Sequence, residues 1–311
     1  MSALDHDAIW EKSRAVVRRA ITARDQGQFG DFCLWCAVSL ELLGKAVLSG
    51  IHPSLIADPQ DVDSIFLACG KPLTANPKTI TAKTVFGRIQ KLSGTFGKVE
   101  FDFCMLMMQR RNADLHSGDL PFANLNPGSW APRFWTVAEL MLQAGGRTLA
   151  DWVGAAEARR ATALIQQAAT VRQQVVEARL ETSRAYFARN YPEESDQTQI
   201  RKLSFSGQLT PSSEFGHLLG DATITETCPA CGCTGRLSGE KVGEDEPNEN
   251  NYNWDAGVVT ITAHFAPSAF RCGVCKMRLD GQEELTHVGM TDNFELEEEQ
   301  EFEIEEPYLN E

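Results

Sequence analysis

Three residues whose side chains are suited to proton transfer and phosphate binding lie close together in the first half of the chain. Arg111 and Asn112 are adjacent, and His116 follows four positions after the asparagine. An imidazole can donate or accept a proton near neutral pH, and a guanidinium fork matches the geometry of a phosphate group. Together these side chains could cleave a phosphodiester bond without a metal ion.

These residues occupy the end of a predicted buried helix, Phe101–Gly118, which begins with an apolar block and is followed by Pro121. On an ideal helix, a spacing of five places Arg111 and His116 about 140° apart around the axis and about 7.5 Å apart along it. We therefore expect the last turn to unwind or the arginine side chain to reach round. The carboxyl end of a helix favours positive charge, which suits His116 as an acid–base residue.

An arginine followed by a polar residue, three further positions and a histidine, late in an all-helical domain, resembles the motif of the HEPN superfamily. That superfamily includes metal-independent ribonucleases of toxin and antiviral systems. The matching positions are Arg111, Asn112 and His116, and the segment Ser39–Ala46 also resembles the second helix of such domains. The resemblance covers about residues 1–155 and implies a HEPN-like helical bundle.

The resemblance also implies an activity. In the family, two copies of the motif meet across a dimer, which would supply the second histidine that one chain lacks. We therefore expect a homodimeric RNA endonuclease in which Arg111 and His116 from both chains face one cleft and Asn112 orients the phosphate or the histidine. The products implied are a 2′,3′-cyclic phosphate and a 5′-hydroxyl.

A non-catalytic role is the alternative. Many helical domains of this superfamily only bind nucleotides or proteins, and fold alone does not establish activity. In that case Arg111 pairs with Asp114 or Asp119, and His116 merely closes a helix. The protein would then be a nucleotide- or protein-binding adapter.

Four cysteines in the second half have the spacing of metal ligands. Cys228 and Cys231 form one CxxC pair, and Cys272 and Cys275 form another about forty residues later. Two such pairs can present four thiolates tetrahedrally to one structural Zn²⁺, as in a zinc ribbon, and residues 258–265 alternate like a strand between them. A reduced dithiol pair or a chance repeat is the alternative. Cys233 and His264 are spare ligands for the same site.

Two features of the predicted helix 32–49 have plain structural explanations. Cys33 and Cys36 also have CxxC spacing, but they lie among apolar residues, so we expect buried thiols that bind no metal. Glu41 and Lys45 are four positions apart and should pair on the helix surface. If that face is buried, Glu41 can instead approach Arg111 or His116 and orient it.

The remaining pattern predicts a mainly α protein. Helices are expected at residues 5–26, 32–49, 62–69, 81–92, 101–118, 133–153 and 155–191. Residues 156–191 form a long polar arm that serves as a spacer or dimerisation helix. A polar linker, 192–220, contains a short predicted strand at Lys202–Phe205. The zinc ribbon-like domain spans 221–290, with a polar insertion at Glu244–Asn253, and an acidic tail spans 291–311.

Charge is distributed unevenly. Residues 221–311 hold 5 basic and 21 acidic side chains, which leaves 24 basic and 22 acidic ones to the first 220 residues. The helical half is therefore nearly neutral, and the acidity of the whole chain does not argue against nucleic-acid binding by this half. Arginines of the first helix, such as Arg18 and Arg19, form either a solvated face or an RNA-facing patch.

The acidic run Glu295–Glu311 contains interspersed aromatic residues, among them Phe302 and Tyr308. It is expected to be a disordered tail, or a mimic of nucleic acid that covers the Arg111–His116 site. The zinc ribbon or this tail could also bind a regulatory protein. No segment has the charge pattern of a leader, and no uninterrupted apolar run approaches membrane-spanning length, so a soluble cytoplasmic protein is expected.

Overall fold

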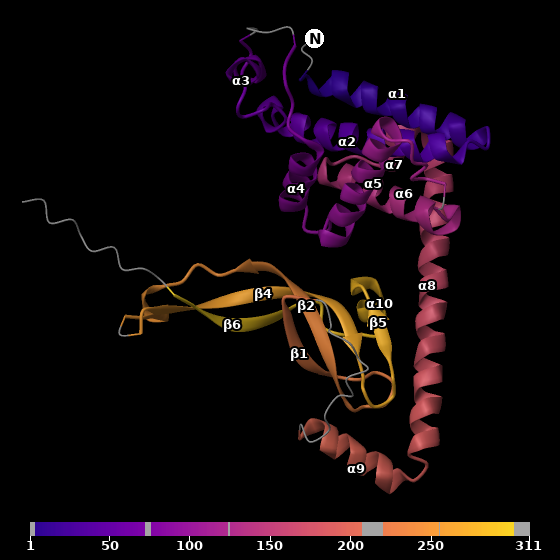
Figure 1. The fold of residues 1–311 in the computed structure, drawn as a ribbon, viewed down its shortest axis with the longest axis vertical. Helices are drawn as coiled ribbons and strands as arrows, with labels where there is room; N and C mark the ends of the chain where they lie inside the picture. The colour runs from indigo at the N-terminus through magenta and orange to yellow at the C-terminus, as the bar shows by residue number, and fades with distance from the viewer. Residues whose placement is uncertain (1–3, 72–75, 124, 207–219, 255, 302–311) are drawn as a thin grey trace, which may run out of the picture. The chain divides into compact units, whose positions relative to one another are not determined.

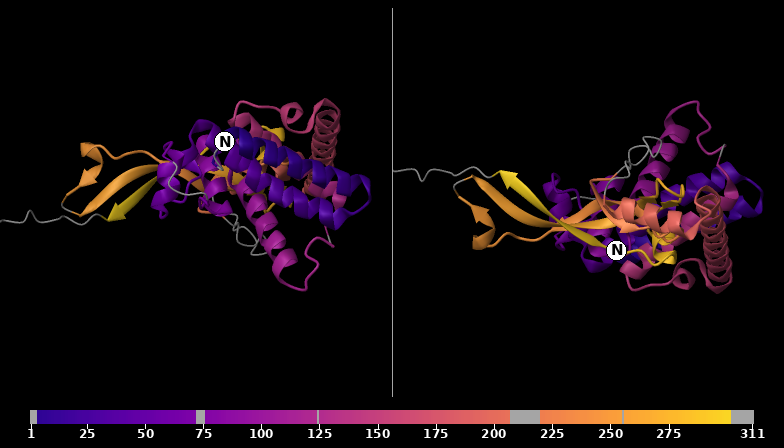
Figure 2. Two further views of the ribbon diagram at one scale, coloured as in Figure 1. Left: turned by 90° about the horizontal axis from the view of Figure 1, so that it is seen from above. Right: turned by 90° about the horizontal axis from the view of Figure 1, so that it is seen from below.

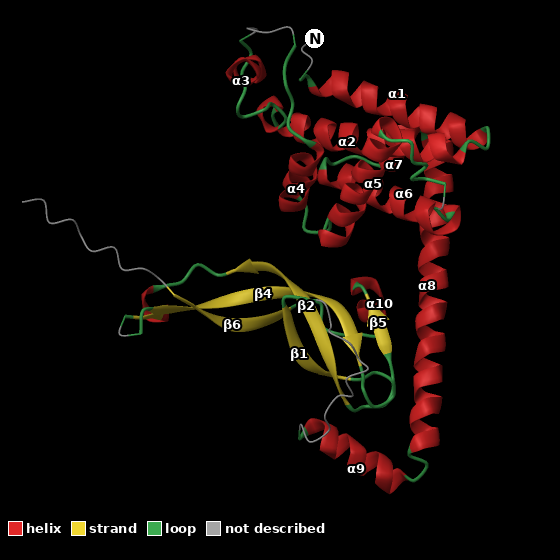
Figure 3. Cartoon of the chain, in the orientation of Figure 1, coloured by secondary structure: helices red, strands yellow, loops and turns green. Residues whose placement is uncertain are grey.

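The computed structural model describes residues 4–71, 76–123, 125–206, 220–254 and 256–301. The chain divides into two compact units, Met1–Ala169 and Thr170–Glu311. The first unit is helical, and the strands of the named sheet all belong to the second (Figures 1 and 3). The prediction of a mainly α protein is confirmed. The division between the units falls inside one long helix rather than at residue 155.

The first unit is a bundle of helices. Its elements are α1 (His6–Asp25), α2 (Phe29–Ile51), η1 (Pro53–Leu55), α3 (Val62–Ala68), α4 (Ala82–Leu92), α5 (Lys98–His116), α6 (Pro127–Ala144), α7 (Leu149–Val153) and the first part of α8 (Ala155–Asn190). The predicted helix 133–153 is therefore wrong as one element, because the chain turns at Gly145 and Gly146. Gly146 adopts a φ of 66°, a backbone conformation that glycine accepts without steric cost.

Helix α2 is the core of this unit, and α1, α4, α5 and α6 all contact it. Cys33 and Cys36 on α2 are fully buried, as predicted. Burial raises the pKa of the Cys33 thiol to about 12, so this thiol stays protonated. Among the described helices, α2 alone is long and apolar enough to cross a membrane by length and composition. However, 67% of its apolar window is buried, as in the core helix of a soluble protein.

Helices α1 and α2 lie antiparallel and side by side (Figure 2). The end of α2 is joined to the residues just before α1 by a hydrogen bond of 2.7 Å from Ser49 Oγ to Leu4 O. His6 also donates from Nδ1 to Ala46 O at 2.9 Å, and its Nε2 accepts from Arg147 at 3.0 Å. These contacts fix one tautomer of His6, since a carbonyl oxygen can only accept.

The other end of α1 is tied to the start of α8. Arg24 donates two hydrogen bonds to the carboxylate of Glu157, one of them from Nη2 to Oε2 at 3.0 Å. The side chain of Glu157 is only 8% exposed. The pKa of Arg24 is raised by this pairing, which outweighs the lowering effect of burial. A buried carboxylate of this kind depends on its cation.

The second unit combines part of α8 with a six-stranded antiparallel sheet. Its elements are α9 (Glu194–Phe205), β1 (Ala222–Thr227), β2 (Thr234–Glu244), η2 (Glu249–Asn251), β3 (Tyr252–Asn253), β4 (Val258–Arg271), β5 (Arg278–Asp280), α10 (Gln282–His287) and β6 (Phe294–Glu301). The strands are ordered β1-β2-β4-β3, and β5 and β6 also pair with β4. Figure 2 shows the twist of the ribbon made by β4 and β6. Val176, Leu180 and Phe187 of α8 contribute to the core of this unit.

Two expectations for this half are wrong. Residues 202–205 belong to helix α9 and not to a strand; its first turn carries Glu194 and Asp196 and its last turn Lys202, charges that favour a helix. Residues 294–301 of the predicted acidic tail form strand β6, in register with β4 from Phe294 opposite Phe265 to Glu301 opposite Val258. The alternation of Phe294, Leu296 and Glu298 with exposed glutamates gives the segment one inner face. Phe302 and Tyr308 lie outside the described residues.

Replacing Glu157 by glutamine should destabilise the first unit. Arg24 would lose its buried carboxylate and keep only the exposed Asp25, so the free energy of unfolding should fall on the order of 2–3 kcal/mol, somewhat less than for a fully buried pair. Urea unfolding followed by tryptophan fluorescence measures this, since Trp254 is the single tryptophan outside residues 1–169. Glu11→Gln, which breaks an exposed pair with Arg14, is the matched control and should change stability by under about 1 kcal/mol. Equal effects of the two variants on stability would contradict the stabilising role of the Arg24–Glu157 pair.

Candidate functional site

The carboxyl end of α5 carries Arg111, Asn112 and His116, and it lies against the middle of α2. Arg111 donates from Nη1 to Oε2 of Glu41 on α2. The same guanidinium donates from Nε and Nη2 to Oδ1 of Asn112, at 3.2 and 3.0 Å. The second oxygen of Glu41 accepts from Lys45 at 2.7 Å. Glu41 therefore pairs with both cations. The sequence suggested the pair with Lys45, and it suggested the approach to Arg111 for the case that this face of the helix is buried.

This arrangement leaves part of the Arg111 guanidinium available. A guanidinium has five N–H donors, and the three bonds above use one on each nitrogen. Among the residues that the structure describes, no further acceptor is found for the second N–H of Nη1 or of Nη2, and guanidinium N–H groups of this kind can bind phosphate oxygens. The Arg111 side chain is 19% exposed, so part of it reaches the surface.

His116 is the last residue of α5, and its side chain is exposed. Within the described part of the chain, no hydrogen bond joins it to Arg111 or Asn112. The structure therefore brings Arg111 and Asn112 together and places His116 on the final turn beyond them. The helix continues to His116, so the expectation that its last turn unwinds is wrong.

The adapter hypothesis named different partners for Arg111. Asp119 instead accepts a hydrogen bond from Ser117 Oγ at 3.0 Å, just after the helix ends. The observed partner of Arg111 is Glu41, which lies 70 positions earlier in the sequence. The ion pair is intramolecular, as an adapter requires, but its neighbours Asn112 and His116 are exposed.

The pKa of Glu41 reflects its position between two cations. Burial alone would raise the pKa of this carboxyl, but the hydrogen bonds and charges of Lys45 and Arg111 outweigh burial and lower it. Glu41 is consequently ionised at neutral pH, and it can hold Arg111 in one orientation.

The second candidate site is a cluster of four buried thiols. The sulfurs of Cys228, Cys231, Cys272 and Cys275 all lie within 4.8 Å of one another. Cys228 and Cys275 are 3.5 Å apart, and Cys231 and Cys272 are 3.7 Å apart. A tetrahedral ion with metal–sulfur bonds of about 2.3 Å requires sulfurs separated by about 3.8 Å. The donor set thus fits a four-thiolate metal site and is compatible with zinc.

The two CxxC pairs are held by matching turns. One lies between β1 and β2, where Cys228 N donates to Cys233 O at 2.8 Å; the other lies between β4 and β5, where Cys272 N donates to Met277 O at 3.0 Å. The residue after each pair has a left-handed backbone, with φ of 72° at Gly232 and 66° at Lys276. Lys276 is the single described non-glycine residue in that region, which indicates that the turn dictates its conformation.

Helix α9 supports the first turn. Arg201 donates from Nε to Cys231 O at 2.8 Å, and Ser204 Oγ accepts from Thr234 N at 3.0 Å. The fixed position of Cys231 therefore depends on a helix that the sequence pattern did not reveal.

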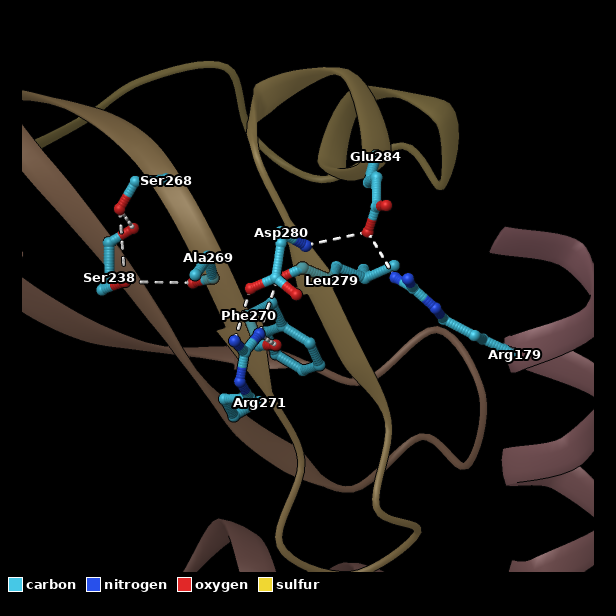
Figure 4. Close-up of polar contacts among 9 residues, drawn as sticks. All are labelled: Arg179, Ser238, Ser268, Ala269, Phe270, Arg271, Leu279, Asp280 and Glu284. Atoms are coloured by element: carbon cyan, nitrogen blue, oxygen red, sulfur yellow. Dashed lines mark hydrogen bonds and ion pairs between the residues drawn. The ribbon is translucent and has the colours of Figure 1, made fainter. Parts of the chain in front are cut away.

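A polar network supports the second turn (Figure 4). Arg271, which precedes Cys272, donates to Asp280 and to Leu279 O across β4 and β5. Asp280 N in turn donates to Glu284 of α10 at 2.8 Å. Arg179 of α8 completes the chain of contacts with a 2.7 Å bond to the same Glu284 oxygen. The two strands that flank the second turn, β4 and β5, are thus braced by two helices.

The spare ligands have other surroundings. His264 lies between Asp245 and Glu295, at 2.8 and 3.3 Å, and its pKa is raised mainly by the hydrogen bond to Asp245. Cys233 is buried beside the first turn but does not belong to the four-thiol cluster. Within the cluster, the pKa of Cys272 is lowered because other thiols, Cys228 first, donate to its sulfur. Four thiolates at these distances need a cation between them.

No protein-family model, curated protein or solved structure matches the chain. Its function must therefore be argued from its own residues.

Acid should remove the contribution of Glu41 to stability. Its pKa is lowered in the folded state, so the contribution is complete above the unfolded value of about 4.3 and is lost as pH falls through the folded value. Glu41→Gln should therefore cost about 1–3 kcal/mol at neutral pH, and this cost should shrink below about pH 4. Urea unfolding of both proteins across that pH range measures it. A difference that stays constant with pH would contradict the ionised pair.

Proposed function

We propose that this protein is a metal-independent RNA endonuclease in which Arg111, Asn112 and His116 form the reactive site. The observation that carries the proposal is the fixed Arg111 guanidinium, which has two N–H groups without an acceptor among the described residues, at the same helix end where His116 is exposed. The resemblance of these three positions to the HEPN motif supports the same function. The proposal places the activity in a cytoplasmic toxin or antiviral defence system.

The chemistry needs two proton transfers. The ribose 2′-oxygen attacks the phosphorus and gives its proton to one histidine, while the bond from phosphorus to the 5′-oxygen breaks and that oxygen takes a proton from a second histidine. Arg111 stabilises the charge that develops on the phosphate oxygens, and Asn112 holds Arg111 in place. The products are a 2′,3′-cyclic phosphate and a 5′-hydroxyl.

One chain supplies one such histidine. The proposed active form is therefore a symmetric homodimer in which His116 of each copy faces the same phosphate, one as base and one as acid. Glu41 is a positioning residue in this scheme, because it contacts Arg111 and not the RNA.

The four-thiol cluster is proposed to be a structural zinc site in a zinc ribbon-like domain. Four protein thiolates complete the coordination of Zn²⁺, so the ion would stabilise the fold and leave no position open for a substrate. Such a domain, whose sheet includes the acidic strand β6, can also serve to dock a regulatory protein.

The specific observation that favours an adapter instead is the intramolecular pair of Arg111 with Glu41. In that alternative the pair serves only to join α5 to α2, and the protein binds nucleotides or other proteins without cleaving RNA.

Substituting His116 should abolish cleavage. In cells induced for each variant, the wild type should arrest growth and degrade RNA, whereas His116→Ala and Arg111→Ala should lose about 100-fold or more of the cleavage rate. Lysates tested with chelator, and end mapping of the products, check the metal-free chemistry. The matched controls are His52→Ala and Arg110→Ala. A folded, zinc-loaded wild-type dimer that leaves RNA intact would establish the adapter in place of the nuclease.

Zinc should co-purify with the wild-type chain, and replacing Cys228 by serine should remove it, because three remaining thiolates hold the ion far less tightly. Elemental analysis gives the metal content, and near-ultraviolet circular dichroism reports the loss of packing in residues 170–311. Cys69→Ser is the control, since Cys69 is exposed and lies outside the cluster. Retention of full zinc content by Cys228→Ser would overturn the site.

A further inference from the structure

The first unit has an open groove of about 310 Å³, lined by polar and apolar atoms, where the second half of α1 meets the start of α2. Its walls combine cationic, amide and aromatic side chains with one carboxylate. The lining residues are Ala15, Arg18, Arg19, Thr22, Ala23, Gln26, Gln28, Asp31 and Trp35. None of these positions belongs to the Arg111–His116 site.

The cations of this groove differ from the other arginines of α1. Arg14 pairs with Glu11 at 2.8 Å, and Arg24 pairs with Glu157. Arg18 and Arg19 are exposed and have no acidic partner among the residues that the structure describes. In a chain with a net charge of −14, two guanidiniums and a single carboxylate, Asp31, give this groove a local excess of positive charge that attracts anions.

Trp35 adds a surface for stacking. Its side chain is half-buried, and the Arg19 guanidinium lies over its ring at 5.6 Å from the centroid. By contrast, Trp130, Trp135 and Trp152 are buried in the core. Indole rings and guanidinium planes are both surfaces on which nucleobases stack.

The remaining polar groups suit the edge of a base. Gln26 and Gln28 offer amide donors and acceptors, and the Asp31 carboxylate can accept from an exocyclic amino group. A cavity of this volume lies at the lower end of the range for small ligands, which is the size of a single nucleotide.

We infer that this groove binds one nucleotide of a single-stranded RNA, with the phosphate on Arg18 and Arg19 and the base on the stack of Trp35 and Arg19. The choice of RNA rests on the proposed ribonuclease function. The shared chemistry, a base joined to a phosphate, is also that of a free nucleotide. The groove thus acts as a subsite that anchors a strand away from the cleaved bond.

The test uses the full chain carrying His116→Ala, so that bound RNA is not cleaved. Fluorescence anisotropy with a short labelled single-stranded RNA, and competition by AMP or UMP, should be measured at physiological ionic strength. Arg18→Gln combined with Arg19→Gln, and separately Trp35→Leu, should each weaken RNA binding about 10-fold or more. Lys12→Gln combined with Lys91→Gln removes the same charge from exposed positions outside the groove and should leave affinity within about 2-fold, because nonspecific electrostatic attraction is screened.

The outcomes distinguish RNA binding in the groove from RNA cleavage at the Arg111–His116 site. Loss of affinity in both groove variants but not in the control supports the inference. If AMP or UMP binds in the groove and the RNA does not, the ligand is a free nucleotide. Unchanged affinity in the groove variants, or no binding of RNA or nucleotide by the parent, overturns it. Binding through the groove by a wild type that cleaves nothing would leave this inference standing while the ribonuclease proposal falls.

In the active background, the arginine variant should raise KM with kcat unchanged, because the groove lies away from the reacting atoms. A fall in kcat with KM unchanged would contradict an anchoring role. His116→Ala, by comparison, should lower kcat, so the two failures cannot be confused.

Discussion

Helix α2 sets the constraint on which the first unit depends. It is apolar on nearly every side, so neighbours must cover most of its surface, and α1, α4, α5 and α6 do so. Into this apolar helix the sequence places a carboxylate, Glu41. A largely buried charge must be compensated, and Lys45 and Arg111 provide the compensation. The same electrostatic requirement that stabilises the bundle thereby fixes the orientation of Arg111.

That coupling of stability and geometry bears on function. An arginine held by a carboxylate and an amide loses little side-chain entropy when it binds a phosphate, since its orientation is already set. The same contacts also suit a purely structural arginine, which is why the exposed His116 and the two N–H groups without a described acceptor matter to the argument. Arg18 and Arg19 present the opposite case, because neither forms an ion pair among the described residues and the groove they line holds one carboxylate, Asp31, against two cations.

The second unit depends on a different constraint, the crowding of four thiols. Bringing four sulfurs within 4.8 Å requires both turns to be held from behind. Arg201 of α9 holds the first, and the contacts among Arg271, Asp280 and Glu284 hold the second. Strand β6 then extends the sheet along β4 with glutamates on its exposed face. The acidity of this half of the chain is therefore partly built into the sheet.

The sequence by itself determined those features that depend on local spacing. Helical periodicity predicted the helices around α1, α2, α4 and α5, and the two CxxC pairs predicted the four-thiol cluster, because ligand spacing within a turn is a local property. It also predicted Cys33 and Cys36 as buried thiols. Periodicity did not predict α9 or β6. Helix α9 is polar with a short apolar stretch at its end, and β6 has the composition of a charged tail, so that only its pairing with β4 identifies it as a strand.

Only the tertiary structure decided which residues compensate one another. Glu41 and Arg111 are 70 positions apart, and Arg24 and Glu157 are 133 apart. Sequence offered Asp114 or Asp119 for Arg111 because these carboxylates are near in the chain, but the packing of α5 on α2 brings Glu41 within reach of Arg111 instead. Such pairs follow from the packing of whole elements around a shared core, and their energies depend on the burial that packing creates.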